Sequence, residues 1–431
     1  MRHRIHQEIF LISSFLLAFF LPVFPKLLPT IIFIMLANWL ISGIYLATLP
    51  KFFKEKWRIL TVSFSSLYLF YLFGMLYSTD CTYGWFDLEV KLSLLIFPVI
   101  FSTSDLTIFN SARLKLFFIF FIGGCVAGSL VFLGHTWIVN ERWGVKDAFY
   151  YTHLSWYLHP SYLAMYFTFA AGILLYYLTG AFNKDSILRT IVLSLLVLYL
   201  EAFIFLLSSK AGLIMLVITE CLFIVLLIIR KTKISQIVLV SVFMGVIFIG
   251  FSRIFPYAFY RISKADSMLS ASHSIQQNPN DGTLQRMEIW KVSIGLIKHN
   301  FLFGVGTGDV KDVLMEAYRQ NNLYPVFQKK LNAHNQYIQT FITLGICGFG
   351  LLTCLLLIPA YQSLRKGNFL YTLFLLTFSI NIVVESMLET QAGVVFYAFF
   401  NVFLFSQNAG TKDLQNSGPP PATPTLNLIE K

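Results

Sequence analysis

The chain is poor in charged residues. Only 12% of its 431 residues are Asp, Glu, Lys or Arg, whereas a soluble domain carries about 25%. In contrast, 57% of the residues are hydrophobic, and they include 45 Phe and 21 Tyr. This composition excludes an ordinary soluble domain. It favours helices that face lipid, with aromatic residues near the membrane surface.

Cysteine and clustered metal ligands are also scarce. The five cysteines are scattered, and they form no Cys-x-x-Cys pair and no cluster with histidine. Neither a disulfide framework nor a structural metal site is therefore expected. The segments between apolar runs also lack a group of acidic and histidine residues at ligand spacing. The sequence thus predicts no metal and no cofactor.

Apolar runs long enough to cross a bilayer recur throughout the chain. We predict twelve of them, at 9–24, 27–49, 59–78, 88–103, 114–138, 159–179, 187–207, 211–229, 234–251, 335–358, 369–386 and 391–407. The fold class is therefore an all-α polytopic membrane protein with about twelve transmembrane helices. No small-residue cleavage site follows the first run, so we interpret it as a retained helix and not as a signal peptide.

The distribution of Lys and Arg predicts how these helices are oriented. Seven segments on one side, including both chain ends, hold 17 basic residues, whereas the opposite short loops hold five: Lys26, Lys91, Arg142, Lys146 and Lys210. The positive-inside rule therefore places both termini in the cytoplasm. The net charge of +11 is explained mostly by this topology and does not argue for binding to nucleic acid.

Four parts of the chain are predicted on this basis. They are nine helices in 1–250, a large outer loop in 251–333, three helices in 334–407 and a disordered cytoplasmic tail in 408–431. Within the loop, the pattern predicts two short helices, 284–298 and 309–320. Asp309 is expected to cap the second helix. The glycine-rich stretch 304–308 between them has no preceding strand, so it predicts a turn better than a phosphate-binding loop.

The most informative spacing is His334-Asn335, nine residues, then Gly345-x-x-Gly348. It lies where the outer loop re-enters an apolar helix, so the histidine is expected at the membrane surface. A histidine there can take a proton from one substrate while a lipid-anchored substrate is held beside it. The glycines are expected to let a neighbouring helix pack closely. The histidine alone is also compatible with a plain helix end.

Three cations are predicted to face outward near the lipid boundary. Lys210 lies in a short hairpin between two apolar runs, Arg286 opens the first loop helix four residues before Trp290, and Arg142 lies in the loop 140–158. A charge in an apolar setting tends to be functional. The alternatives are a snorkelling side chain for Lys210 and a solvated helix charge for Arg286.

Two further polar groups are expected at the same surface. His159 precedes a helix that Pro160 is expected to start, and with Tyr162 it forms a second candidate contact for a substrate. Glu385 and Glu389 flank the last outer turn and are suited to pair with one of the cations. A base surrounded by cations suits transfer from a lipid-anchored diphosphate. Lys and Arg stabilise the leaving group, and a histidine with a pKa of about 6.5 can deprotonate an acceptor hydroxyl.

These residues resemble the O-antigen ligase and O-antigen polymerase superfamily. The spacing from His334 to Gly348 matches the family's pattern of His, then Asn, Ser or Gln, nine residues, and Gly-x-x-Gly. Arg286-x-x-x-Trp290, followed by the glycine-rich stretch 303–308, is also similar to the family's loop. Lys210 stands where the family has an outer-surface arginine, so the charge is kept but the bidentate fork is lost.

The resemblance implies an inverting, metal-independent transfer of a glycan from undecaprenyl diphosphate to lipid A core or another glycan acceptor. It also implies a multi-pass protein of the bacterial inner membrane, surrounded by membrane lipids, whose active site faces the periplasm. On this basis the predicted catalytic residues are His334, Arg286 and Lys210, and the predicted donor or acceptor contacts are Asn335, Arg142, His159, Tyr162 and Trp290.

Three functions are compatible with the sequence. A ligase would move a finished glycan onto lipid A core, whereas a polymerase would use the same donor with a second lipid-linked repeat as acceptor. The complete glycine pattern favours the ligase. A transporter or flippase fits less well, because transporters tend to have two related halves and polar residues at mid-membrane, and the sequence has no such repeat.

Overall fold

The computed structural model describes residues 2–46, 56–145, 147–184, 187–258, 260 and 281–413. Helices dominate these ranges, and no strand occurs in them. Eight helices are long and apolar enough to cross a membrane, and three shorter apolar helices accompany them. The chain is therefore a polytopic helical membrane protein, as its composition predicts, while the number of twelve spans stays a prediction.

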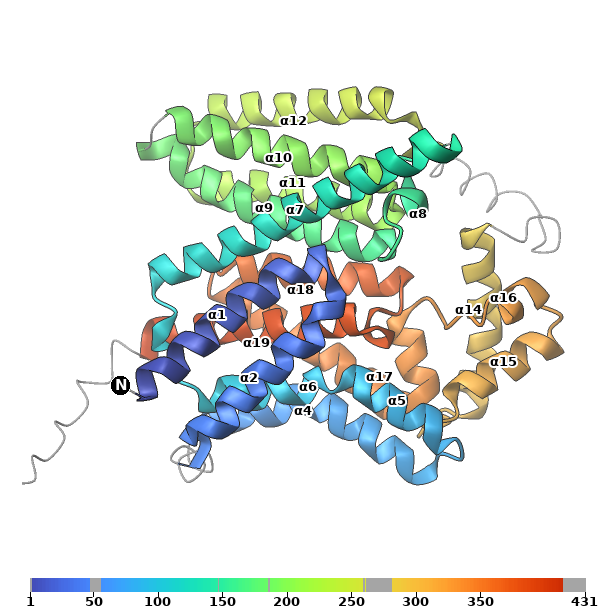
Figure 1. Ribbon diagram of the computed structural model, residues 1–431. Helices are drawn as coiled ribbons and strands as arrows, with labels where there is room; N and C mark the ends of the chain where they lie inside the picture. Colours follow the sequence, from blue (N-terminus) through green and yellow to red (C-terminus); the bar gives the residue numbers. More distant parts are fainter. Residues whose placement is uncertain are drawn as a thin grey trace, which may run out of the picture.

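The helices of the bundle lie roughly side by side (Figure 1). In chain order they are α1 (Arg2–Val23), α2 (Leu28–Ser42), α4 (Lys56–Gly74), α5 (Cys81–Lys91), α6 (Ser93–Thr103), α7 (Ser111–Trp143), α9 (Pro160–Lys184), α10 (Ile187–Leu207), α11 (Lys210–Ile229), α12 (Ile234–Ile254), α17 (Gln336–Arg365), α18 (Phe369–Val384) and α19 (Gln391–Asp413). Short turns of helix connect some of them: η1 (Pro25–Leu27), η2 (Met75–Tyr77), η3 (Leu106–Ile108), α8 (Tyr151–Leu154) and η4 (Met387–Glu389).

Several boundaries differ from the sequence-based expectation; α7, for example, ends at Trp143 and not at 138, so Arg142 lies in this helix and not in the predicted loop 140–158. The predicted run 88–103 is not one helix, because α5 ends at Lys91 and α6 begins at Ser93. The predicted tail does not begin at 408, because α19 continues to Asp413, and 414–431 lie outside the described residues. By contrast, α9 begins at Pro160 as expected, which suits a residue that lacks a backbone N–H.

α5 is amphipathic in the reverse sense to a helix of a soluble protein. Its inward face contains Asp87 and Lys91, which are buried, whereas Trp85 and Phe86 on its outward face are 61% and 60% exposed. A helix that turns charge inward and aromatic rings outward is suited to lipid surroundings. Lys91 therefore does not reach the outer surface, although the sequence alone groups it with the basic residues there.

Phenylalanine rings fill the centre of the bundle. The ring of Phe117 in α7 lies 4.3 Å from that of Phe403 in α19, and Phe121 lies 4.9 Å from Phe400, measured between ring centres. Such offset and edge-to-face ring pairs add to the energy of burying the rings. Much of the high Phe content thus serves the packing between helices as well as the lipid-facing surface.

The outer segment forms a small unit beside the bundle, at the right of Figure 1. It contains α14 (Gly282–His299), α15 (Val310–Gln320) and α16 (Tyr324–Gln328), which is one helix more than the sequence predicts. These helices and the start of α17 share a hydrophobic cluster of their own: Ile289, Val310, Leu314, Tyr318, Leu323, Val326, Ala333 and Ile342.

The carboxylate of Asp309 has a different role from the expected helix cap. It makes no cap hydrogen bond to α15. Instead it accepts hydrogen bonds from the backbone N–H groups of Thr79 and Asp80, both at 2.8 Å, at the start of α5. The prediction that Asp309 caps its own helix is therefore wrong, and the residue ties the outer unit to the bundle.

Gly345, the first glycine of the pair after His334, also serves a purpose other than helix–helix packing. At Gly345 the helix α17 is interrupted, with φ 66° and ψ −162°. Backbone of the outer segment crosses there: Val305 N donates to Ile342 O, and Gly306 N donates to Thr343 O. A Cβ on Gly345 would lie 2.2 Å from the backbone oxygen of Leu302. The close neighbour of Gly345 is thus an irregular segment and not the helix that the sequence led us to expect.

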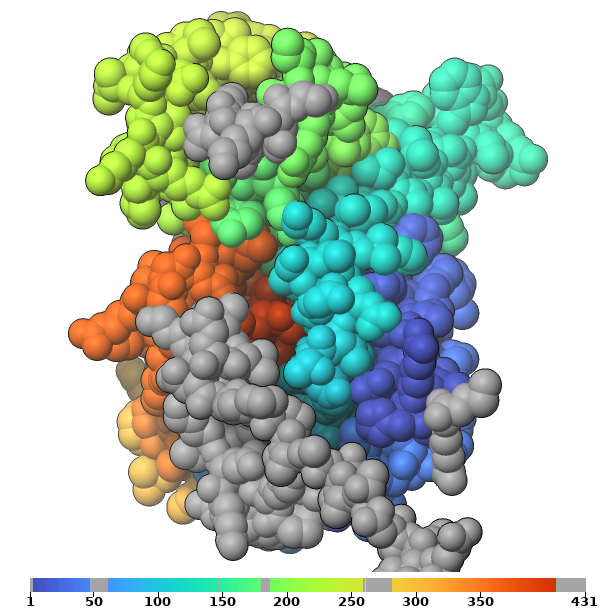
Figure 2. All heavy atoms as spheres, turned by 90° about the vertical axis from the view of Figure 1, so that its left-hand side faces the viewer, coloured from blue at the N-terminus to red at the C-terminus, as the bar shows by residue number. Residues whose placement is uncertain are grey.

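The start of α1 and the end of α19 lie on one face of the bundle (Figure 1). Near the start of α1, Glu8 forms an ion pair with Arg113 of α7 at 2.7 Å. Phe10 and Phe403 of α19 both contact the ring of Phe109. Figure 2 looks onto this face, where the blue of α1 lies beside the cyan start of α7. The outer unit lies at the opposite end of the bundle (Figure 1).

Candidate functional site

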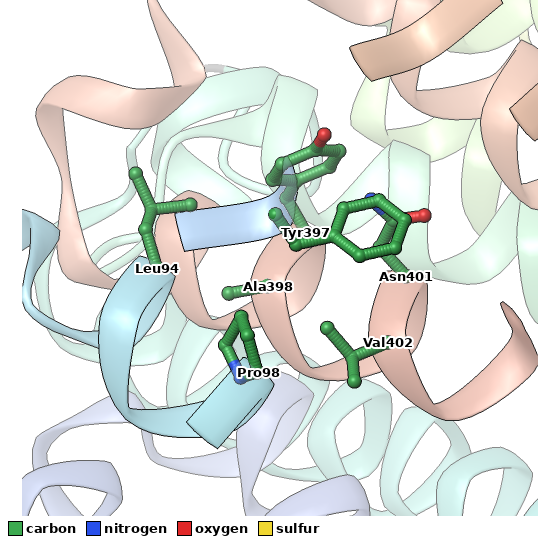
Figure 3. A pocket seen from close by; sticks show the side chains of 7 residues that line it. Leu94, Pro98, Tyr397, Ala398, Asn401 and Val402 are labelled. Atoms are coloured by element: carbon green, nitrogen blue, oxygen red, sulfur yellow. The ribbon is translucent and has the colours of Figure 1, made fainter. Parts of the chain in front are cut away.

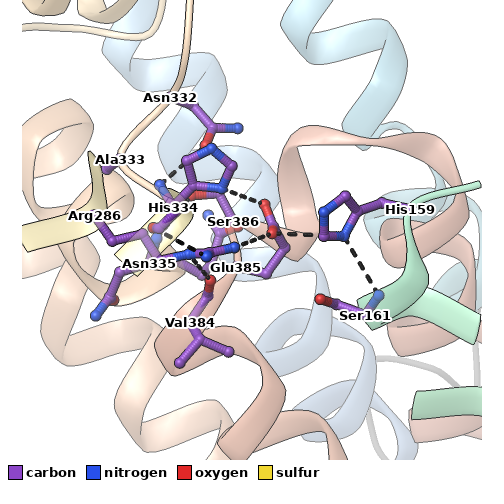
Figure 4. Close-up of polar contacts among 12 residues, drawn as sticks. His159, Ser161, Arg286, Asn332, Ala333, His334, Asn335, Val384, Glu385 and Ser386 are labelled. Atoms are coloured by element: carbon purple, nitrogen blue, oxygen red, sulfur yellow. Dashed lines mark hydrogen bonds and ion pairs between the residues drawn. The ribbon is translucent and has the colours of Figure 1, made fainter. Parts of the chain in front are cut away.

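The carboxylate of Glu385 lies where the outer segment meets the connection between α18 and α19. Nδ1 of His334 lies 2.8 Å from its Oε1, and the guanidinium of Arg286 lies 3.3 Å from its Oε2. Nδ1 of His159, just before α9, lies 3.8 Å from Oε2. Figure 4 shows the three basic side chains converging on Glu385 from three different segments. The structure thus brings together three of the residues that the sequence singles out.

His334 is held in a strained backbone conformation. Its φ is +45°, in the left-handed region that a residue with a Cβ rarely adopts. Such strain costs about 1–3 kcal/mol and persists only where the surroundings fix it. Here the side chain of Asn332 accepts from His334 N at 3.0 Å, and Gln339 Oε1 accepts from Ala333 N at 3.0 Å. Trp290 Nε1 donates to Ala333 O at 3.0 Å.

The contact with Glu385 decides which nitrogen of His334 is available. An ionised carboxylate only accepts hydrogen bonds, so Nδ1 of a neutral His334 carries the proton and donates it. Within the described part of the chain, Nε2 makes no hydrogen bond. Its lone pair is therefore the one that can accept a proton from a substrate. The side chain is 19% exposed, so this nitrogen is not sealed inside the protein.

Glu385 is buried, with only 7% of its side chain exposed. It follows the last residue of α18 and lies outside that helix. Burial alone would raise the pKa of the Glu385 carboxyl. The hydrogen bond from His334 and the nearby charges of His334, His159 and Arg286 outweigh burial and lower this pKa to about 2. Glu385 therefore stays ionised at every pH at which the protein is expected to work.

The side chain of Arg286, which lies on α14, is fixed by three contacts. Besides the contact with Glu385, Nε donates to Val384 O at 3.0 Å and one terminal nitrogen donates to Gly282 O at 3.3 Å. A guanidinium has more N–H groups than these contacts use, so it can still bind an anion. Its side chain is 22% exposed.

Lys210 reaches the same helix as Arg286. Its ammonium donates to Oγ1 of Thr283 at 2.6 Å, in the first turn of α14. Arg286 lies three residues further along that helix. Two cations thus gather at a helix N-terminus, which itself favours anions. Asp281 caps this turn, because its Oδ1 accepts from Thr283 N and Leu284 N.

Three other predicted residues lie close to this cluster, and each has a structural contact of its own. Asn335 caps α17 through its side chain, and its backbone N donates to Oγ of Ser386 at 3.1 Å. The buried Tyr162 approaches Ser386 O with its hydroxyl at 3.5 Å. Trp290 uses its indole N–H on the backbone beside His334, as described above. These contacts position the site, and binding of a donor or acceptor by these residues stays a prediction.

Comparison with known sequences adds the family. Residues 192–353 match the family described as O-antigen ligase. Residues 192–353 thus form an O-antigen ligase domain. The match includes Lys210, Arg286 and His334, so the predicted catalytic residues all lie within the O-antigen ligase domain. This domain supports a bacterial membrane protein of the ligase or polymerase type of glycosyltransferase. No curated protein matches the chain.

Glu385 and His159 both lie outside the matched O-antigen ligase domain. The sequence suggests Glu385 as a partner for an outer cation, and it does pair with Arg286. Glu389, the other candidate, pairs instead with Lys91, at 3.2 Å. The sequence motif around His334 lies within 192–353. It therefore does not include Glu385, the carboxylate that contacts His334.

Arg142 is separate from the cluster in the structure. It is exposed in the last turn of α7, and within the described ranges no hydrogen bond or ion pair joins it to the cluster. Its role as a contact for a bulky glycan stays a prediction. The described residues also contain no group of three His, Cys, Asp or Glu side chains that could hold a metal ion.

A small pocket elsewhere in the bundle is not part of this site. It lies between α4, α6 and α19, where it is lined by Phe64, Leu94, Pro98, Tyr397, Ala398, Asn401 and Val402 (Figure 3). It leaves no space for a water molecule. None of the residues predicted to be catalytic lines it, so this pocket is separate from the outer cluster.

Proposed function

We propose that this chain is an O-antigen ligase that transfers a glycan from undecaprenyl diphosphate to a hydroxyl group of lipid A core or a similar acceptor. The carrying observation is the pairing of His334 Nδ1 with Glu385 at 2.8 Å, which leaves Nε2 available as a base. The match of residues 192–353 to the O-antigen ligase family supports this class of reaction.

In the proposed reaction, the acceptor oxygen attacks the anomeric carbon of the lipid-linked sugar. As the new C–O bond forms, the acceptor proton passes to Nε2 of His334, and Glu385 stabilises the charge that develops on the imidazole. The bond between the anomeric carbon and the phosphate oxygen breaks on the opposite face, so the configuration inverts. Undecaprenyl diphosphate leaves with the bonding electrons.

Arg286 and Lys210 supply the positive charge for that leaving group in the proposal. Both contact the first turn of α14: Lys210 contacts Thr283, and Arg286 contacts Gly282. Cations and helix N–H groups aimed at the diphosphate stabilise charge that grows in the transition state. Their positions support a reaction that needs no metal ion.

The proposed orientation follows from charge and geometry. The outer unit lies at the end of the bundle away from the start of α1 (Figure 1). If the basic segments are cytoplasmic, both termini lie in the cytoplasm of an inner-membrane protein, and the His334 cluster faces the periplasm. The lipid tail of the donor then lies along the apolar outer surface of the bundle.

The decisive experiment is transfer by the purified chain in proteoliposomes that contain the undecaprenyl-diphosphate glycan. In parallel samples the acceptor is lipid A core or a second lipid-linked repeat, and a sample without acceptor serves as control. We expect glycan on lipid A core. Elongated lipid-linked glycan in the second sample, with none on lipid A core, would make the chain a polymerase. Movement of donor across the bilayer without bond formation would favour the transporter alternative.

A further inference from the structure

A second polar cluster lies inside the bundle, around Lys91 at the end of α5. The Lys91 side chain is fully buried, and its ammonium lies 2.5 Å from Asp87 and 3.2 Å from Glu389. The same ammonium lies 4.7 Å from the centre of the Tyr71 ring. The carboxylates are also buried, with 6% and 8% of their side chains exposed. The function proposed above makes no use of this cluster.

Burial of three ionisable groups is not explained by stability. Well-packed apolar residues in place of a buried ion cluster are often equally stable or more stable. Ionisable residues inside a membrane bundle are more often tied to function. The Lys91 cluster is too enclosed to touch a substrate. Any functional effect must therefore act through the residues that contact it.

Gln336, which is completely buried, connects the Lys91 cluster to the site. Its Nε2 donates to Glu389 Oε1 at 3.2 Å, on the oxygen that Lys91 also contacts. Its Oε1 accepts from Leu388 N at 2.7 Å. One amide thus clamps the first residue of α17 to both the backbone and a side chain of the α18–α19 connection.

The clamp joins the two segments that carry the reactive pair. Gln336 is two residues after His334, and Glu389 is four residues after Glu385. We propose that Lys91, Glu389 and Gln336 are positioning residues that hold His334 and Glu385 in register, while Asp87 balances the charge of Lys91. This inference rests on the proposed glycosyltransferase function. It adds Lys91 and Glu389, which lie outside the O-antigen ligase domain, to the residues that serve that function.

The physical reason is the sensitivity of proton transfer to geometry. The α18–α19 connection carries Glu385 at its start and is pinned at its end through Glu389. Without that pin, the carboxylate and the imidazole of His334 can shift relative to each other. A misplacement of about 1 Å can cost about a hundredfold in rate even when the mutated residue is distant.

The test compares two identical substitutions in the full chain. Glu389→Met removes the clamp and leaves Lys91 balanced by Asp87. Glu201→Met is the matched control, since Glu201 is a buried carboxylate of α10 with no part in the site. For Glu389→Met we expect kcat to fall roughly ten- to a hundredfold with little change in the KM for the donor. Glu389→Gln, which keeps an acceptor oxygen, should recover most of the rate, and Glu201→Met should retain it.

Several outcomes decide between the proposals. Equal losses of kcat in Glu389→Met and Glu201→Met would overturn the positioning role and leave a general effect of packing. Should Glu389→Met not fold, Gln336→Met removes the same clamp without changing any charged residue, and a wild-type kcat in that variant would overturn the inference. An absence of transfer by the wild-type chain would overturn both this inference and the proposed function.

Discussion

His334 and Glu385 are joined by a hydrogen bond of 2.8 Å between Nδ1 and Oε1, although 51 positions separate them in the chain. Arg286 contacts the other oxygen of the same carboxylate at 3.3 Å. One acidic group therefore orients both the proposed base and the proposed diphosphate contact. A shift of Glu385 would disturb proton transfer and leaving-group stabilisation together.

Replacement of His334 by alanine should remove the proposed general base. We expect His334→Ala to lower the rate of transfer by roughly 10²–10⁴-fold, which is the usual contribution of a positioned base. The measurement is single-turnover transfer by purified protein in proteoliposomes. His299→Ala is a suitable control, because His299 is exposed at the end of α14. Near-normal transfer by folded His334→Ala protein would rule out this role.

The two cations near the start of α14 should respond differently to conservative exchange. Arg286→Lys should remain about a hundredfold below wild type, because a lysine cannot contact Val384 O and Glu385 together and still offer a fork to phosphate. Lys210→Arg should retain substantial activity, because it restores the arginine that the O-antigen ligase and polymerase superfamily has at this position. Donor binding and turnover of each variant provide the measurement, with Lys291→Ala on the same helix as control. Unchanged affinity and turnover in both Lys210→Ala and Arg286→Ala would exclude the clamp.

The ionisation of Glu385 predicts how stability depends on pH. Its pKa is lowered from 4.5 to about 2, because the contacts with His334, His159 and Arg286 outweigh burial. A carboxyl group with a lowered pKa contributes stability that is complete above its unfolded pKa and is lost as the pH falls through the folded pKa. The difference in melting temperature between wild type and Glu385→Gln should thus be largest above pH 4.5 and should shrink toward pH 2. A difference that stays constant down to pH 3 would contradict this assignment.

The positions of the helices could largely be predicted, because lipid leaves little choice. Backbone in a bilayer must satisfy its own hydrogen bonds, so a long apolar run is helical. The break between α5 and α6 could not be predicted, since no glycine or proline lies within five residues of Leu92 to mark it. The interruption at Gly345 was equally hidden, because it depends on backbone of the outer segment that hydrogen-bonds to Ile342 and Thr343.

The candidate site could be predicted in part. His334 and Arg286 stand out because polar residues at fixed spacing are rare in an apolar chain. The sequence offers two acidic candidates, Glu385 and Glu389, for their common partner. It does not distinguish between them, because pairing across the bundle leaves no periodicity in the sequence. The sequence wrongly predicts Lys91 at the outer surface for a related reason. A single lysine at the end of an apolar run is typical of an interfacial residue. Its partner Glu389 lies on a different helix connection, so the sequence does not reveal the pair.

The left-handed backbone at Gly345 should be intolerant of a side chain. Gly345→Ala places a Cβ 2.2 Å from Leu302 O in a conformation with φ +66°, so we expect a loss of about 1–3 kcal/mol or more in stability. Gly350→Ala is the matched control on α17, because nothing lies within 4 Å of its added Cβ. Thermal unfolding in detergent micelles compares the two variants. Equal melting temperatures would show that the outer segment does not cross α17 at Gly345.

Transfer should not depend on a divalent cation, because Arg286 and Lys210 take the place that Mg²⁺ often occupies beside a phosphate leaving group. Two acidic residues of the outer unit are engaged elsewhere: Asp309 accepts from Thr79 and Asp80, and Glu316 pairs with Arg319 at 2.8 Å. Activity in proteoliposomes should therefore persist in excess EDTA. The melting temperature of the same treated sample controls for loss of folded protein. Activity that disappears in EDTA from folded protein and returns with Mg²⁺ or Mn²⁺ would make the proposed mechanism of leaving-group stabilisation wrong.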